Sequence, residues 1–153
     1  MTGRVFVDTN VLGYARDEGA GEKRQTAARW LELLWRRRDG RLSYQVLNEF
    51  YVTVTQKLSP GMDPGAAWAD VQALYAWKPR AIDRPVLELA FHLAMRLSLS
   101  WCDSLILSAA RLEECSYLLS EGLQAGLEFD GTRVVDPFDV EPEGYLTEPG
   151  QPV

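Results

Sequence analysis

Histidine is almost absent from this chain of 153 residues. The single His92 falls among charged residues at a spacing of four, with Glu88 before it and Arg96 after it, on the polar stripe of a predicted helix. A solvated histidine of this kind excludes His-based catalytic triads and most zinc chemistry. Motifs of other enzyme classes are also missing, because the sequence has no P-loop, no Rossmann glycine pattern and no GxSxG.

Cysteine and long apolar runs are scarce as well. Cys102 and Cys115 fall at the two ends of a predicted helix, where a rise of about 1.5 Å per residue separates them by roughly 19 Å, beyond disulfide reach. We expect two buried or inert thiols. No stretch approaches the roughly 18 apolar residues of a membrane span, and the segment 1–8 lacks the features of a signal peptide. We therefore expect a soluble, cytoplasmic protein that does not associate with a membrane.

The net charge of −6 is unusual for a protein that binds nucleic acid, so the position of the acids matters. Residues 136–153 contain five of the 22 acidic residues, four prolines and no Lys or Arg. The remaining 17 acids nearly balance 16 basic residues, so the body of the chain is close to neutral. We expect one domain at 1–138 and an acidic, Pro-rich, flexible tail at 139–153.

Short apolar runs alternate with helical patterns along the domain. Strands are predicted at 4–7, 117–119 and 133–135, and helices at 21–38, 43–57, from 63, from 83 to 97, and at 101–114. The apolar faces of the helices at 21–38 and from 63 are predicted to include Trp30, Trp35, Trp68, Val71, Leu74 and Tyr75. Strands that alternate with helices indicate an α/β domain with a mostly parallel sheet.

Asp8 directly follows the first predicted strand. Ligands of open α/β sheets gather at the carboxyl ends of the strands, so this position suits a functional site. An Asp at this position is equally a good N-cap for the helix that follows. The residue alone leaves both roles open.

Two further acids lie in apolar surroundings. Glu49 falls mid-helix beside Leu47 and Phe50, and a partly buried carboxylate needs a cation or hydrogen-bond donors, supplied either by a metal or by an arginine. Asp103 opens the helix of WCDSLILSAA, where the helix dipole also favours an acid. A site made of carboxylates suits Mg²⁺ or Mn²⁺ rather than zinc, and such ions catalyse phosphodiester hydrolysis.

Four segments in order carry a resemblance to a known family. They are VDTNVLGYA at 7–15, SYQVLNEFYVTVTQKL at 43–58, LSWCDSLILSAA at 99–110, and LLSEGLQAG with VVDPF within 118–138. Together they resemble the PIN domain, specifically the VapC-type toxin ribonucleases of toxin–antitoxin systems. The resemblance spans about residues 4–138.

The resemblance implies a three-layer αβα fold whose parallel sheet brings distant acids together. It also implies Mg²⁺-dependent cleavage of single-stranded RNA, homodimerisation and inhibition by a cognate antitoxin. Asp8, Glu49 and Asp103 match the catalytic, metal-binding acids of such proteins, while Asn10 and Ser120 match polar positions that support the site.

One departure from the family pattern falls in the segment after the predicted strand at 117–119. Where such proteins typically have SEDLQ, this chain has Ser120-Glu121-Gly122-Leu123-Gln124. The fourth carboxylate is therefore missing at Gly122, or Glu121 takes its place as a weaker metal ligand.

The mechanism that we expect has Asp8 and Asp103 as direct ligands of one Mg²⁺. Glu49 is a third ligand or orients the water that attacks the phosphorus. RNA needs basic side chains at the rim of such a pocket, and the densest basic cluster consists of Arg36, Arg37, Arg38 and Arg41. The alternative for this cluster is a solvated helix end.

Two other enzyme classes with an acid after the first strand do not fit the sequence. An aspartyl-phosphate phosphatase has a second acid two positions after the first, where this chain has Asn10, and a response-regulator receiver needs a paired acid and a late lysine that are not evident. A housekeeping RNA-processing nuclease and a PIN-like binding module that lost activity with its fourth acid remain as alternatives.

Overall fold

A five-stranded sheet forms the centre of the molecule, in the order β2-β1-β3-β5-β4. This computed structural model describes residues 3–146. The strands are β1 (Arg4–Val7), β2 (Gly40–Arg41), β3 (Cys115–Leu119), β4 (Glu128–Phe129) and β5 (Thr132–Val135). β1 pairs in parallel with β2 and β3, β3 pairs in parallel with β5, and β4 is antiparallel to β5. The predicted mostly parallel sheet is therefore confirmed.

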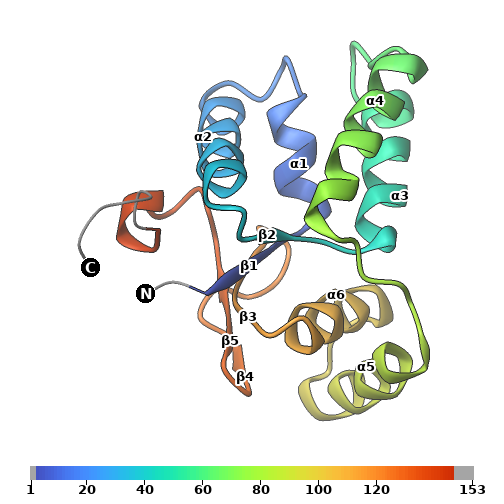
Figure 1. Cartoon of the computed structure of the whole chain (residues 1–153), viewed down its shortest axis with the longest axis vertical. Coiled ribbons are helices and arrows are strands. Elements are labelled where there is room, and N and C mark those ends of the chain that lie inside the picture. The colour runs from blue at the N-terminus through green and yellow to red at the C-terminus, as the bar shows by residue number, and fades with distance from the viewer. Residues whose placement is uncertain (1–2, 147–153) are drawn as a thin grey trace.

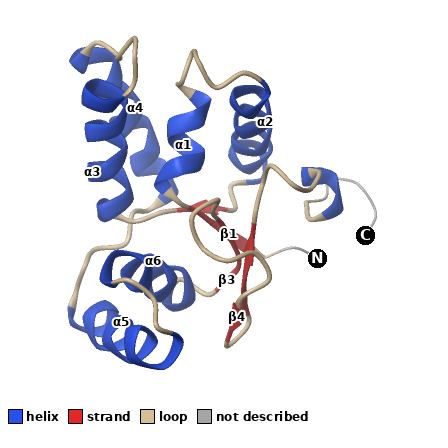
Figure 2. Ribbon diagram, turned by 180° about the vertical axis from the view of Figure 1, so that it is seen from behind, coloured by secondary structure: helices blue, strands red, loops and turns tan. Residues whose placement is uncertain are grey.

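Helices cover both faces of this sheet. They are α1 (Thr9–Ala15), α2 (Glu22–Arg37), α3 (Tyr44–Val52), α4 (Pro64–Leu74), α5 (Arg84–Leu97) and α6 (Trp101–Leu112). A π-helical turn, η1 (Thr53–Lys57), extends α3, and 3₁₀ turns η2 (Tyr75–Trp77) and η3 (Pro142–Gly144) follow α4 and β5. α1 to α4 lie on one side of the sheet and α5 and α6 on the other (Figure 1). The view from behind shows the same three αβα layers (Figure 2).

Local sequence explains where these elements begin. The hydroxyl of Ser43 accepts a hydrogen bond from the Val46 N–H at 3.3 Å, and the carboxylate of Asp83 accepts one from the Val86 N–H at 3.2 Å. Asp63 caps α4 in the same way, and proline occupies the first position of that helix. Each of these helix starts was predicted from the sequence and is confirmed. Both faces of β1 are covered, which explains its unbroken apolar run.

The predicted apolar faces are partly wrong. Trp35, Trp68 and Tyr75 are 41%, 48% and 44% exposed. In α4, which packs on α3, η1 and η2, only the narrow stripe of Ala67, Val71 and Leu74 is buried, so Trp68 and the following Tyr75 remain exposed. The strands β2 and β4 were not predicted, because two residues give no periodicity.

Both cysteines are free, as expected. Cys115 is buried at the start of β3, and burial raises the pKa of its thiol to about 12, which makes it unreactive. Cys102 is exposed in the first turn of α6, so of the two expected alternatives, a buried or an inert thiol, burial does not apply to it. His92 is exposed on α5, as predicted.

The segment after residue 138 differs from the expected flexible tail. The ring of Tyr145 contacts those of Trp30 and Tyr117, with centroids 6.3 Å and 5.1 Å away, and Leu146 is only 4% exposed. Glu143 forms an ion pair with Arg29. Residues 139–146 thus belong to the packed domain, because their apolar side chains cover α2 and β3. The rest of the predicted tail, residues 147–153, lies outside the described residues. In the described part of the chain, no helix has the length and apolar character to cross a membrane.

Candidate functional site

Asp8 lies at the carboxyl end of β1, next to the end of β3. Its backbone N–H donates to the Leu119 carbonyl at 3.0 Å, which continues the ladder between the two strands. Its Oδ1 accepts a hydrogen bond from the Thr9 N–H at 2.7 Å, and its Oδ2 accepts one from the Ser120 hydroxyl at 2.8 Å. The carboxylate therefore caps α1, one of the two roles proposed from the sequence, and it also contacts the end of the adjacent strand, where a functional site was expected.

Burial makes this carboxylate unusual. Asp8 is only 7% exposed, and desolvation raises its pKa from 3.8 to about 6. The hydrogen bonds from Ser120 and Thr9 act in the opposite direction, whereas the negative charges of Glu49 and Asp103 raise the pKa further. The fold thus brings Glu49 of α3 and Asp103 of α6 within electrostatic range of Asp8, which follows β1.

Glu49 is half-buried on α3 and is held by two neutral donors. The Thr9 hydroxyl donates to its Oε2 at 2.7 Å, and the Gln45 amide donates to its Oε1 at 3.1 Å. The same Gln45 amide donates to the Cys102 carbonyl at 3.3 Å, which joins α3 to the first turn of α6. The arginine partner considered from the sequence is not found for Glu49 among residues 3–146.

Asp103 occupies that first turn of α6. Its backbone N–H donates to the hydroxyl of the N-cap residue Ser100 at 3.1 Å, and its side chain is half-buried. The helix N-terminus favours the negative charge, as the sequence indicated. Within the described residues, Asp8, Glu49 and Asp103 form no ion pair with a cationic side chain.

These residues fit a hard divalent cation in their chemistry. All their donor atoms are carboxylate oxygens, which Mg²⁺ prefers, and their three negative charges have no cationic partner among residues 3–146 to offset them. In the same part of the chain, no three His, Cys, Asp or Glu side chains already converge as a metal-ligand set. The structure therefore brings the predicted acids near one another, but their carboxylates do not converge on a single point.

Polar residues of the segment after β3 support this arrangement. The Ser120 hydroxyl donates to Asp8 and accepts hydrogen bonds from the N–H groups of Gly122 and Leu123, both at 3.1 Å. Asn10 accepts a hydrogen bond from the Glu121 N–H at 3.3 Å through its Oδ1. Ser120 and Asn10 thus fasten this segment to Asp8 and to the start of α1.

Glu121 is directed toward α1 and α2. Its carboxylate accepts a hydrogen bond from the Tyr14 hydroxyl at 2.6 Å and forms an ion pair with Lys23. Lys23 and then Tyr14 lower the pKa of this carboxyl group. The lysine also lies over the rings of Tyr14 and Phe138, with 5.0 Å and 5.3 Å to their centroids.

Gly122 lies beside Asn10 and Ser120. A Cβ built there would lie 3.5 Å from Asn10 Nδ2 and 3.9 Å from Ser120 Oγ, both ordinary contacts. Its φ is not in the left-handed region, so the backbone would not strain a side chain at this position. A side chain at position 122 would therefore extend beside Asn10 and Ser120.

A cavity of about 330 Å³ adjoins Asp8 and Glu49, whereas Asp103 is not part of its lining. It runs between α1 and α3, and its lining includes Asp8, Asn10, Tyr14, Glu49 and Thr53. This volume lies within the range of small-ligand sites. The cavity gives the carboxylates of Asp8 and Glu49 a common opening.

The basic cluster does not border this cavity. Arg36, Arg37 and Arg38 end α2 and precede β2, at the amino end of the strand, whereas the acids lie at the carboxyl ends. Arg36 pairs with Glu32, Arg37 pairs with Asp39, and Arg41 is buried. The prediction that this basic cluster lines the rim of the acidic site is therefore wrong. Because the strands are parallel, the arginines before β2 and the acids lie at opposite ends of the sheet.

Thr9 and Gln45 were not singled out as site residues from the sequence. Gln45 lies one helical turn before Glu49, a spacing that could have identified it. The role of Thr9 depends on the distance between α1 and α3, for which the sequence contains no signal.

Several known proteins share the fold of this chain. The chain resembles a toxin–antitoxin complex from Klebsiella pneumoniae, with a TM-score of 0.64 and 22% identity over 87% of this chain and 97% of that one. It also resembles Mycobacterium tuberculosis VapC20, a sarcin-ricin loop cleaving toxin (TM-score 0.56, 17% identity, 74% and 86% covered), and Rickettsia felis VapBC2 bound to a promoter DNA fragment (0.57, 17%, 85% and 96%). No curated protein sequence matches the chain. The sequence model of the PIN domain matches residues 5–124, and the chain therefore belongs to the PIN domain family.

Proposed function

We propose that this protein is a Mg²⁺-dependent endoribonuclease that cleaves single-stranded RNA and acts as a VapC-type toxin. The observation that carries the proposal is the buried carboxyl of Asp8. Its pKa is raised to about 6, mainly by burial and to a smaller extent by the negative charges of Glu49 and Asp103. A PIN domain with a gathered set of acids at the strand ends supports a nuclease. The likeness to toxins of toxin–antitoxin pairs supports the toxin role.

In this proposal Asp8 and Asp103 hold the metal directly. Glu49 is the third ligand or orients the attacking water, and Mn²⁺ can substitute for Mg²⁺. When bound, the metal supplies a water with a lowered pKa and offsets charge on the phosphate oxygens. Ser120 and Thr9 aim the carboxylate of Asp8 through hydrogen bonds of 2.8 and 2.7 Å. Above about pH 6, Asp8 is ionised and able to act as a ligand.

Three carboxylates suffice in this scheme. Because both oxygens of Glu121 are engaged by Tyr14 and Lys23, we assign Glu121 a supporting role at the rim rather than that of the fourth acid. Gly122, in turn, supports a competing candidate function, a PIN-like binding module that has lost cleavage together with the fourth acid.

The proposed partner is a cognate antitoxin encoded next to this protein. Carboxylates without a cationic partner in the described part of the chain attract a basic side chain, so we expect the antitoxin to place an arginine or lysine near Glu49 and Asp103. A homodimer in the cytoplasm is part of the same proposal. Growth arrest on expression, relieved by the neighbouring gene, would separate a toxin from a housekeeping RNA-processing nuclease.

The direct test is cleavage of single-stranded RNA by the purified protein. We expect activity with Mg²⁺ or Mn²⁺, none with a chelator, and a loss of most activity in Asp8→Asn and in Asp103→Asn. The matched control is Asp130→Asn, which removes an exposed acid in the turn between β4 and β5. Full cleavage by a folded Asp8→Asn protein would refute the metal-site assignment. RNA binding without cleavage in the wild type would favour the binding module.

A further inference from the structure

A second cavity lies at the start of β2, apart from the acids. Its volume is about 360 Å³, and its lining includes Trp35, Arg38, Gly40, Arg41, Trp77 and Lys78. Gly40 is required there, because a Cβ would lie 2.7 Å from carbons of the Trp77 ring. The buried Trp77 thus packs directly on the backbone of β2 and forms the base of the cavity.

Arg41 brings a buried positive charge to this cavity. It is only 9% exposed, and its Nη1 donates to the carbonyls of Gly40 at 2.8 Å and Arg38 at 3.2 Å. Within residues 3–146 it has no carboxylate partner. The positive charge of a buried guanidinium that contacts only carbonyl acceptors is not balanced by a negative charge. An anion in the cavity would balance it.

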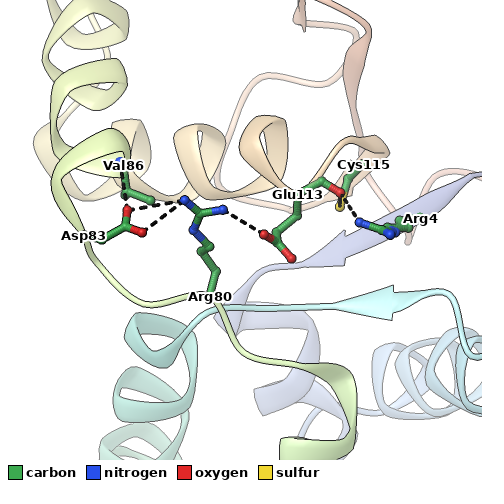
Figure 3. Close-up of polar contacts among 6 residues, drawn as sticks. All are labelled: Arg4, Arg80, Asp83, Val86, Glu113 and Cys115. Carbon is green, nitrogen blue, oxygen red and sulfur yellow. Dashed lines mark hydrogen bonds and ion pairs between the residues drawn. The ribbon is translucent and has the colours of Figure 1, made fainter.

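Two exposed cations flank the same opening. In the described part of the chain, neither Arg38 nor Lys78 forms an ion pair. Arg80, two residues after Lys78, is different, because it pairs with Asp83 and Glu113 and joins the segment before α5 to the end of α6 (Figure 3). The lining of the cavity contains no acidic residue, although the whole chain is acidic.

The backbone at these two cations has a conformation that glycine adopts readily. Arg38 and Lys78 both have left-handed φ values, 60° and 55°, at the ends of α2 and η2. Glycine adopts this conformation without strain and is common after helices. Instead, long cationic side chains occupy both positions and meet at one cavity. The helix dipole accounts for a cation after α2, but the three-residue turn η2 has almost no dipole to favour Lys78.

An aromatic surface accompanies these charges. Trp35 is 41% exposed and contacts Trp77 with ring centroids 5.2 Å apart at 58°. An exposed indole beside cations is the combination that binds single-stranded nucleic acid, since a base stacks on the ring while the phosphate contacts the cations. An acidic peptide would bind the cations but has no base to stack on the indole.

We propose that this cavity binds one nucleotide of a single-stranded RNA. Its base stacks on Trp35, and its phosphate is bound by Arg38, Arg41 and Lys78. The inference rests on the proposed function in taking RNA as the ligand, and it adds an anchoring site that is separate from the cleavage site. The RNA is therefore held at the amino end of β2 as well as at the acids.

The test measures binding of a fluorescein-labelled single-stranded RNA to the metal-free, full-length protein by anisotropy at several salt concentrations. The main variant is Arg38→Gly with Lys78→Gly, which removes both charges at positions where glycine is unstrained. Its dissociation constant should rise about tenfold, and the salt dependence should fall by about 1.4 in slope for two lost phosphate contacts. Trp35→Leu should weaken binding by roughly tenfold through lost stacking. The control is Arg24→Gln, an exposed cation near the other end of α2, which should stay within twofold of wild type.

The outcomes separate this inference from the proposed function. If the double glycine variant binds RNA as tightly as wild type, or if Arg24→Gln weakens binding equally, the inference is wrong even when the wild type cleaves RNA. If an acidic peptide depends on Arg38 and Lys78 while RNA does not, the cavity belongs to a protein partner and the inference is also wrong. If metal-free wild type binds no RNA, the anchoring site is refuted, and the cleavage assay alone decides the proposed function.

Discussion

Replacing Asp8 with asparagine should stabilise the metal-free protein at neutral and alkaline pH. The pKa of Asp8 is raised from 3.8 to about 6, mainly by burial, so the folded state binds its proton more tightly than the unfolded state does. The contribution of Asp8 to the free energy of unfolding is therefore greatest below about pH 4 and falls as the pH rises to about 6. At 1.4 kcal/mol per pH unit, the ionised carboxylate costs the folded state about 3 kcal/mol above that pH.

Asparagine keeps the shape of the side chain and removes this cost. Its single carbonyl oxygen can accept only one of the hydrogen bonds that Thr9 and Ser120 now donate. Loss of the other costs about 1 kcal/mol, which leaves a net gain of about 2 kcal/mol near pH 8. Near pH 4 the gain should disappear, because Asp8 is then protonated in the folded protein.

Urea denaturation with a chelator, at about pH 4.5 and pH 8, measures this difference. The control variant is Glu18→Gln, which changes an exposed acid in the loop between α1 and α2 and should change the free energy of unfolding by less than about 0.5 kcal/mol. A further arm adds Mg²⁺, which should stabilise wild type more than Asp8→Asn if Asp8 is a ligand. The reasoning fails if Asp8→Asn is no more stable than wild type at pH 8, or if its advantage is the same at both pH values.

Three other changes test the surroundings of the site. Glu121→Gln should alter cleavage by less than about threefold, with an unchanged Mg²⁺ requirement, because the carboxylate is bound to Tyr14 and Lys23; a tenfold higher Mg²⁺ requirement would identify it as a metal ligand. Gly122→Asp should fold normally and tighten Mg²⁺ binding, measured by calorimetry against Gly122→Asn, since its Cβ meets only ordinary contacts; equal affinities in the two variants would show that no fourth acid position operates. Leu146→Ala should lower the free energy of unfolding by about 2–4 kcal/mol, because this side chain is 4% exposed; a loss below about 0.5 kcal/mol would mean that the segment 139–146 contributes little to the domain.

Helix starts could be predicted from the sequence because they depend on residues close together in the chain. Ser43, Asp63 and Asp83 cap their helices through hydrogen bonds to backbone N–H groups two or three residues ahead. The predicted strand at 4–7 agrees with β1 for the same reason, since a run of apolar residues reports burial on both faces. The position of Asp8 followed directly from the end of that strand.

Exposure of aromatic residues was harder to predict. Trp30 and Trp35 lie five residues apart on α2, yet Trp30 is fully buried and donates a hydrogen bond from Nε1 to the Pro137 carbonyl, whereas Trp35 is exposed. The difference depends on which part of α2 the segment after β5 covers. The basic cluster was misplaced for a similar reason, because its nearness to the acids depends on the direction of β2.

The sequence by itself determined the longer helices and strands, the caps at Ser43, Asp63 and Asp83, and the α/β class, which arise from local periodicity and short-range hydrogen bonds; family motifs singled out the three acids. Only the tertiary structure decided how these parts meet. The strand order placed Ser120 against Asp8 across 112 positions of sequence, and the packing of α1 on α3 placed Thr9 against Glu49 across 40. Burial of Asp8 and the raised pKa of its carboxyl likewise result from the layers around β1. Such contacts depend on the packing of whole elements against each other, which no local pattern encodes.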